Sequence, residues 1–147
     1  VCDEVVAALD VSIQAEVVNL LIDLQQELGL SYVFISHDLA VVAHLSERIA
    51  VMYLGALVEL GPATDVAQAP QHPYTSALHF AAPELMPSQL RAARPPPLQG
   101  ELPSPLAPPS GCVFRTRCPK AAAICEQKVP EGRMVNARHG VACHFAP

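Results

Sequence analysis

The sequences VCDEVVAALD at residues 1–10 and SYVFISHD at residues 31–38 decide the fold. Each holds a short apolar run that ends in polar residues, which is typical of a buried strand reaching the edge of a sheet. Between them, apolar residues recur at helical spacing over about 12–28, and Asp10 or Ser12 is available to cap that helix. The order strand, helix, strand predicts an α/β fold with parallel central strands.

The residues after the second strand continue the alternation. A short helix is expected over about 39–45. Two apolar runs at 48–54 and 56–60 are separated by Gly55, which favours a hairpin. One or two short helices are expected over 61–82, because a proline there suits a first helical turn.

The chain divides into three units by composition. Residues 1–82 carry the α/β pattern, and residues 83–109 contain nine prolines, which favours a semi-rigid linker. Residues 110–147 form a small cysteine-rich unit that could not build a large core alone. We expect few contacts between the first unit and the last.

Charge separates the two halves of the chain. The net charge of −5 combines one basic and eleven acidic residues in 1–90 with eight basic and three acidic residues in 91–147. Phosphate backbones and anionic headgroups are repelled by an acidic surface, so the first half is unsuited to nucleic acid or anionic lipid.

The first residues of the chain do not resemble a signal peptide, and no apolar stretch resembles a membrane span. The first residues are acidic rather than basic, so no signal peptide is expected, and the longest apolar stretch, 49–58, is too short to span a bilayer. The chain lacks an initiator methionine, and we expect it to begin inside a domain. Without a sign of secretion, its five cysteines are interpreted as metal ligands or buried thiols.

Acidic residues and a histidine follow the two predicted parallel strands. Asp3 and Glu4 are adjacent, and His37 follows the second strand. One carboxylate at such an edge can place Mg²⁺ on phosphates while the other orients a water, and a histidine can donate to a developing negative charge. Taken singly, each motif is more typical of a solvated loop or turn; their order and spacing favour the functional interpretation.

These motifs resemble those of ABC ATPases. Residues 1–4 and 7–10 are similar to the Walker B strand and the D-loop, and residues 36–38 are similar to the switch-histidine motif. Residues 61–62 and 72–75 resemble the oligopeptide, dipeptide and nickel importer branch. The resemblance implies the C-terminal part of a P-loop NTPase sheet, followed by a small Cys-rich extension.

The resemblance also implies roles for particular residues. Asp3 would bind the magnesium of Mg-ATP, Glu4 would activate the attacking water, and His37 would contact the γ-phosphate. Asp10 would lie in the D-loop at a dimer interface. The sequence contains no Gly-rich phosphate loop and no signature motif. We therefore expect a C-terminal fragment of an ATP-hydrolysing subunit that is inactive alone.

The partners expected from this resemblance are those of an importer for di- or oligopeptides, or nickel. They are a second ABC ATPase subunit, membrane permease subunits and, indirectly, an extracytoplasmic solute-binding protein. The subunit would be peripheral on the cytoplasmic face of the membrane, and no nucleic acid is expected. The alternative is a non-hydrolysing remnant or metal-binding docking module that associates with the permease or the partner ATPase.

The tail contains four cysteines in the pattern C-x5-C-x6-C-x17-C: Cys112, Cys118, Cys125 and Cys143. This spacing fits neither common zinc fingers nor bacterial ferredoxins, and the fifth cysteine, Cys2, is expected in the core. The tail resembles the C-terminal region of peptide-importer ATPases, which implies a four-iron four-sulfur cluster. A structural rather than a redox role is expected, because no nearby motif resembles an electron donor or acceptor site. Zinc, held by the four cysteines or with His139 or His144 replacing one of them, and plain thiols or disulfides are the alternatives.

Overall fold

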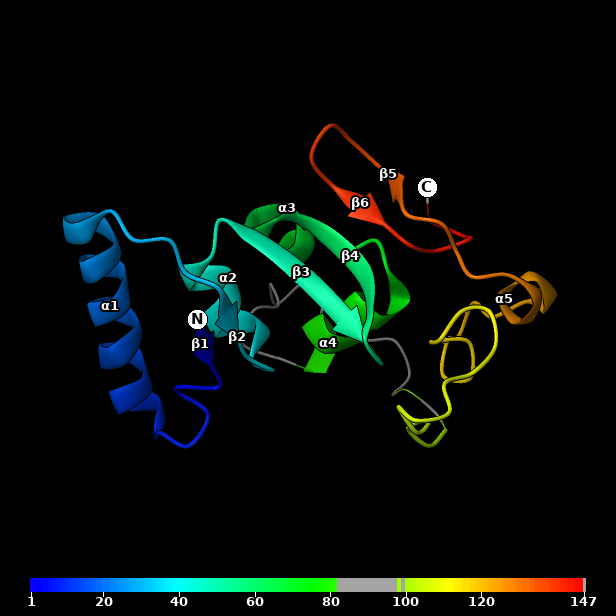
Figure 1. Cartoon of the computed structure of the whole chain (residues 1–147), viewed down its shortest axis with the longest axis horizontal. Helices are drawn as coiled ribbons and strands as arrows, with labels where there is room; N and C mark the ends of the chain where they lie inside the picture. The colour runs from blue at the N-terminus through cyan, green and yellow to red at the C-terminus, as the bar shows by residue number, and fades with distance from the viewer. Residues whose placement is uncertain (82–97, 99, 147) are drawn as a thin grey trace.

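The computed structural model describes residues 1–81, 98 and 100–146. Figure 1 shows helix α1 at one end of the molecule, α5 at the other, and strands β3 and β4 between them. The mixed α/β fold agrees with the prediction, while most of the predicted linker 83–109 lies outside the described residues. The elements in chain order are β1 (Cys2–Asp3), α1 (Val11–Leu28), β2 (Phe34–Ile35), α2 (Leu39–Leu45), β3 (Arg48–Tyr53), β4 (Ala56–Pro62), α3 (Ala63–Gln68), α4 (Pro73–Ala81), α5 (Ala123–Gln127), β5 (Arg133–Met134) and β6 (Gly140–Val141).

Strands β1 and β2 are parallel, as predicted. Cys2 pairs with Phe34 and Asp3 with Ile35, and the amide of Glu4 donates to the carbonyl oxygen of Ile35 at 3.0 Å. The carboxyl ends of both strands therefore meet at one edge. The expectation that Cys2 lies in the core is wrong, because the Cys2 side chain is only half-buried among the described residues.

Helix α1 begins and ends at the residues that its sequence indicates. The side chain of Asp10 accepts a hydrogen bond from the amide of Ile13 at 3.0 Å, which caps the first turn. Gly29 adopts φ 63° and ends the helix. Val18 is buried, whereas Leu20 and Leu28 stay exposed. The apolar stripe of α1 is thus only partly covered by the described residues.

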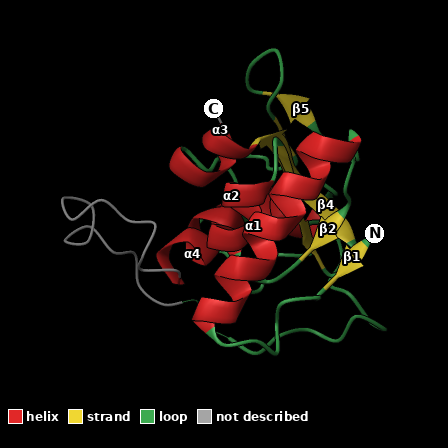
Figure 2. Ribbon diagram, turned by 90° about the vertical axis from the view of Figure 1, so that its left-hand side faces the viewer, coloured by secondary structure: helices red, strands yellow, loops and turns green. Residues whose placement is uncertain are grey.

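The hairpin of β3 and β4 turns at the predicted glycine. Leu54 and Gly55 adopt φ 47° and 78°, the paired positive values of a tight primed turn. Burial alternates along β3, so that Ile49, Val51 and Tyr53 face the core. Figure 2 shows the strands gathered to one side of helices α2 and α4.

The cysteine-rich segment shares the core of the α/β segment, so the expectation of few contacts between them is wrong. Phe114 is fully buried and meets Tyr53 edge to face, with ring centroids 5.1 Å apart. Among the described residues, β6 joins the hairpin in the strand order β3-β4-β6-β5. The physical reason is that a unit this small completes its core by packing against its neighbour.

We expect Phe114→Ala to destabilise the whole chain, not the cysteine-rich segment alone. Removing a buried phenylalanine costs about 3–5 kcal/mol through lost burial and the cavity left behind. Urea unfolding of the 147-residue chain, followed by circular dichroism, measures the change. Phe145→Ala is the matched control, because Phe145 is 44% exposed in the same segment. Equal effects of the two substitutions would contradict the shared core.

Candidate functional site

The edge where β1 and β2 end brings together two of the residues singled out from the sequence. A carboxylate oxygen of Glu4 (Oε1) lies 3.5 Å from Nδ1 of His37. Both side chains are more than half exposed, at 59% and 75%. Their contact therefore contributes little to folding stability, and a water or substrate can reach both groups.

The backbone of Glu4 adopts an uncommon conformation. Its φ of 47° lies in the left-handed region, which a residue with a side chain adopts at an energetic cost. The turn is held by a hydrogen bond from the amide of Ala7 to the carbonyl oxygen of Glu4 at 3.1 Å, and by burial of Val6. This turn directs the Glu4 carboxylate toward the end of β2.

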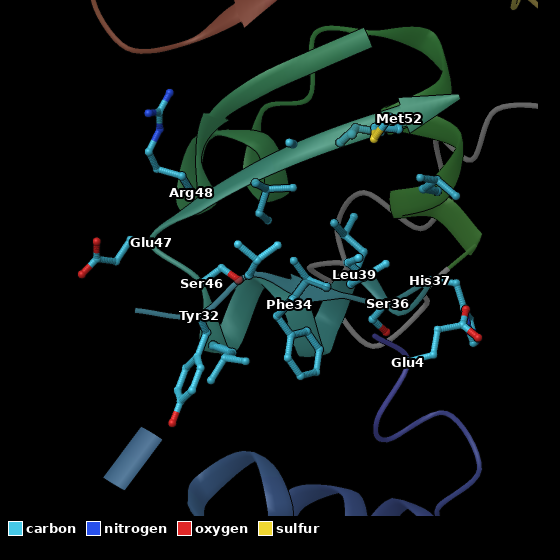
Figure 3. A pocket seen from close by; sticks show the side chains of 18 of the residues that line it. Glu4, Tyr32, Phe34, Ser36, His37, Leu39, Ser46, Glu47, Arg48 and Met52 are labelled. Atoms are coloured by element: carbon cyan, nitrogen blue, oxygen red, sulfur yellow. The ribbon is translucent and has the colours of Figure 1, made fainter. Parts of the chain in front are cut away.

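The residues on either side of His37 fix the start of α2. The hydroxyl oxygen of Ser36 accepts from the amide of Asp38 at 3.1 Å, and Asp38 Oδ1 accepts from the amide of Ala40 at 2.9 Å. Ser36 and Asp38 thus support the turn and the helix cap. His37 is left with its ring beside Glu4 (Figure 3).

An open cavity of about 820 Å³ extends from this edge along the gap between β2 and β3. Glu4 and His37 lie at one end, Arg48 lies at the other, and Phe34 and Met52 line opposite sides (Figure 3). Among the described lining residues Arg48 is the sole lysine or arginine. These residues can orient a water but cannot neutralise a triphosphate.

The two other acidic residues of the predicted site occupy different positions. Asp3 is exposed on β1, next to Glu4. Asp10 caps α1 through its side chain. Asp3 is therefore the sequence neighbour of Glu4 but is not among the described residues that line the cavity shared by Glu4 and His37, and Asp10 has the local role of fixing the helix that follows the loop.

The four cysteines of the tail are free thiols in one neighbourhood. Cys112 and Cys125 are buried, and the amide of Cys112 donates to the carbonyl oxygen of Cys125 at 2.7 Å. Gly111 permits this approach, because its φ is 65° and an added side chain would collide with that carbonyl. Cys118 and Cys143 are half-buried.

The thiols affect one another electrostatically. Burial raises the pKa of Cys112 and of Cys118, and neighbouring cysteines, including Cys143, raise both further. The amide of Lys120 donates to the sulfur of Cys118 at 3.4 Å, which counteracts part of the rise in its pKa. Cys112 and Cys118 are therefore protonated at neutral pH, and a cation that bound them would have to displace their protons.

The cysteines gather without reaching a geometry that holds one ion. Within residues 1–81, 98 and 100–146, no group of three or more His, Cys, Asp or Glu side chains is arranged to bind a metal ion. The structure thus provides four neighbouring thiols but gives no direct support for zinc or iron.

A buried polar cluster escaped the sequence analysis. Glu59 on β4, His72 and His139 are each no more than 2% exposed. Burial lowers the pKa of His72 to about 4, and its Nδ1 accepts a hydrogen bond from the amide of Tyr74 at 3.1 Å, as a neutral ring can. A charged residue on the buried face of a predicted strand was the available signal for this cluster.

Comparison with known proteins identifies relatives over most of the chain. Residues 58–125 match the model of the oligopeptide/dipeptide transporter C-terminal region. The oligopeptide transport ATP-binding protein OppF of Salmonella typhimurium is 58% identical over 97% of this chain and 42% of its own length. OppF of Escherichia coli is 57% identical over 97% and 42%, and a probable peptide ABC transporter ATP-binding protein of Sinorhizobium fredii is 54% identical over 98% and 40%.

These matches define the class of protein as the ATP-binding proteins of ABC transporters. Within that class, residues 58–125 match the oligopeptide/dipeptide transporter C-terminal region, and nearly the whole chain is similar to ATP-binding proteins of peptide transport. It spans about two fifths of the length of the curated relatives it matches. No helix among the described residues is long and apolar enough to cross a bilayer.

Proposed function

We propose that these residues form the C-terminal part of the ATP-hydrolysing subunit of a peptide importer. The observation that carries the proposal is the approach of Glu4 to His37, at 3.5 Å, where two parallel strands end. Ligands of α/β folds bind at this edge. The names of the relatives, ATP-binding proteins of oligopeptide and peptide transport, support the same conclusion.

Each residue at this edge has a separate task in the proposed site. Asp3 holds the magnesium of Mg-ATP, and Glu4 orients and deprotonates the attacking water. His37 donates a hydrogen bond to the γ-phosphate, where negative charge develops during transfer. Asp10 fixes the loop that would contact a partner ATPase, because it anchors the start of α1. The residues that cradle the phosphates would belong to sequence other than these 147 residues.

The proposed complex places this subunit at a membrane. Two ATP-binding subunits would dimerise around ATP beneath permease subunits on the cytoplasmic face, and a solute-binding protein would deliver the solute outside. Di- or oligopeptides are the solutes that the relatives' names favour, with nickel as the other candidate within the resemblance.

The second part of the proposal concerns the tail. Cys112, Cys118, Cys125 and Cys143 would hold a four-iron four-sulfur cluster of structural role. Their mutual electrostatic effects support a shared site. When bound, the cluster would cross-link the tail.

The chain organisation proposed with this function keeps the sequence boundaries. Residues 1–82 would be the C-terminal part of the ATPase domain, 83–109 the Pro-rich linker, and 110–147 the importer-specific C-terminal region. The shared core means that the first and last of these act as one folded body rather than as separate domains.

Titration with Mg-ATP tests the proposal. The complete subunit should bind ATP with a micromolar dissociation constant, whereas a polypeptide of residues 1–147 should show no binding in that range. The reason is that residues 1–90 contain a single lysine or arginine, Arg48, to balance the phosphate charge. Isothermal titration calorimetry measures both, and micromolar binding by the short polypeptide would contradict the assignment.

The same scarcity of basic residues favours the alternative function for these 147 residues on their own. A docking module that does not hydrolyse ATP would use the exposed apolar side chains of α1, such as Leu20 and Leu28, against a permease or partner ATPase. A complete subunit that fails to bind Mg-ATP would favour this alternative.

A further inference from the structure

The carboxylate of Glu59 connects three separate parts of the chain. Glu59 lies on β4 and is 1% exposed. Its Oε1 accepts from the amide of Gln71 at 2.8 Å, and its Oε2 accepts from the amide of His72 at 2.9 Å, just before α4. The same Oε1 lies 2.7 Å from Nε2 of His139, eighty positions along the chain. A buried carboxylate is costly without partners, so these contacts hold their three segments together.

The ring of His139 fits into a space that β4 keeps open. An added Cβ at Gly61 would lie 2.9 Å from Cδ2 of His139, too close for any real side chain. The loop before β6 fixes the same residue, because Asn136 Oδ1 accepts from the His139 amide at 2.9 Å. The space beside Gly61, the hydrogen bond from the His139 amide to Asn136 and the contact of Nε2 with Glu59 thus all favour one position for this ring.

The position of His139 determines where β6 lies. Directly after His139, Gly140 pairs with Leu60 and Val141 with Glu59, and the amide of Ala142 donates to the carbonyl oxygen of Val58 at 2.9 Å. Cys143 is the next residue. The strand that Glu59 anchors through His139 therefore delivers Cys143 to the other three cysteines.

We propose that Glu59 is the positioning residue of the four-cysteine site, holding Cys143 in place through His139 and β6. The inference deepens the proposed function and rests on the four cysteines forming one site. Glu59 acts without touching any sulfur. Through Gln71 and His72 it also links that site to the start of α4, so the tail and the ATPase segment share one anchor.

Disulfide mapping tests this position without any metal. The metal-free 147-residue chain is oxidised with oxidised glutathione, and the disulfides are identified by mass spectrometry after digestion. The readout is the ratio of disulfides containing Cys143 to those among Cys112, Cys118 and Cys125. Glu59→Gln should lower this ratio about tenfold. Without the Glu59–His139 contact, the segment that carries Cys143 is no longer held near the other cysteines, so the effective concentration of Cys143 beside them falls.

A second variant reaches the same contact by another route. Gly61→Ala displaces the His139 ring and leaves the Glu59 carboxylate intact, and it should also lower the ratio. Glu47→Gln is the matched control, because Glu47 is exposed just before β3, and it should change nothing. An unchanged ratio in both test variants overturns the proposal. Loss of amide hydrogen-exchange protection in β3 and β4 overturns it too, since Glu59 would then support the core in general.

Iron reconstitution separates this inference from the proposed function. If the unaltered chain binds iron and Glu59→Gln loses most of the visible thiolate–iron absorption, both stand. If the unaltered chain binds no metal while the disulfide ratio still falls, the cluster fails and the positioning role stands. Equal iron binding by the two chains with equal disulfide ratios removes Glu59 from the site and leaves the cluster.

Discussion

Replacing Glu4 by glutamine in the complete ATP-binding subunit should lower ATP turnover about a hundredfold or more while ATP binding is unchanged. Loss of a positioned general base costs about 10²–10⁴ in rate. Glutamine has nearly the same size as glutamate and can still reach His37, but its amide cannot accept the proton from water. Single-turnover hydrolysis and Mg-ATP titration measure the two effects separately.

The control for this experiment is Glu16→Gln. Glu16 is an exposed carboxylate on α1, so its loss changes charge equally without touching the strand edge. Neither substitution should shift the thermal midpoint, because the Glu4–His37 contact is largely exposed. His37→Ala should also impair turnover, because the proposed contact of His37 with the γ-phosphate would be lost. Unchanged turnover in Glu4→Gln would remove Glu4 from the proposed mechanism.

The first third of the chain could be predicted because its signals are local. The apolar spacing changes from strand-like to helical at the capping Asp10, and Gly29 marks the end of the helix. Gly55 likewise marked the hairpin turn, since glycine adopts a positive φ more readily than other residues do. Strand ends in a parallel pair share one edge, so Asp3, Glu4 and His37 were expected together from sequence.

The remaining structure depends on contacts between distant residues. Strands β5 and β6 each span two residues, too short for an alternating pattern. Phe114 lies among cysteines and arginines, so nothing nearby in the sequence indicates that it packs in the same core as the side chains of β3. The Glu59–His139 contact joins residues eighty positions apart. Such contacts form only when the tail packs against the hairpin, so no local sequence pattern predicts them.

The shared core also changes what loss of a metal would do. If few contacts joined the two units, as the sequence predicted, loss of a metal would unfold residues 110–147 and spare the α/β part. The structure places Phe114, Cys112 and Cys125 in one cluster with residues of β3 and β4. Loss of a metal from the tail should therefore lower the stability of both parts together.

Loss of a single tail cysteine should change the metal content of the protein. If the four tail cysteines hold one four-iron cluster, anaerobically purified protein should be brown and contain about four irons per chain. Serine in place of Cys112, Cys118, Cys125 or Cys143 should remove most of the iron and its visible absorption, because each supplies one thiolate. Iron analysis, absorption spectra and thermal unfolding measure the result.

Cys2→Ser is the matched control, since it removes a half-buried thiol on β1 and should leave both iron and colour unchanged. A colourless protein with one tightly bound zinc would overturn the iron–sulfur proposal and keep the four ligands. A metal-free protein in which residues 110–146 stay folded would overturn both. In that case the buried pair Cys112 and Cys125 would serve as core thiols, and the stability of the tail would rest on Phe114 and the pairing of β6 with β4.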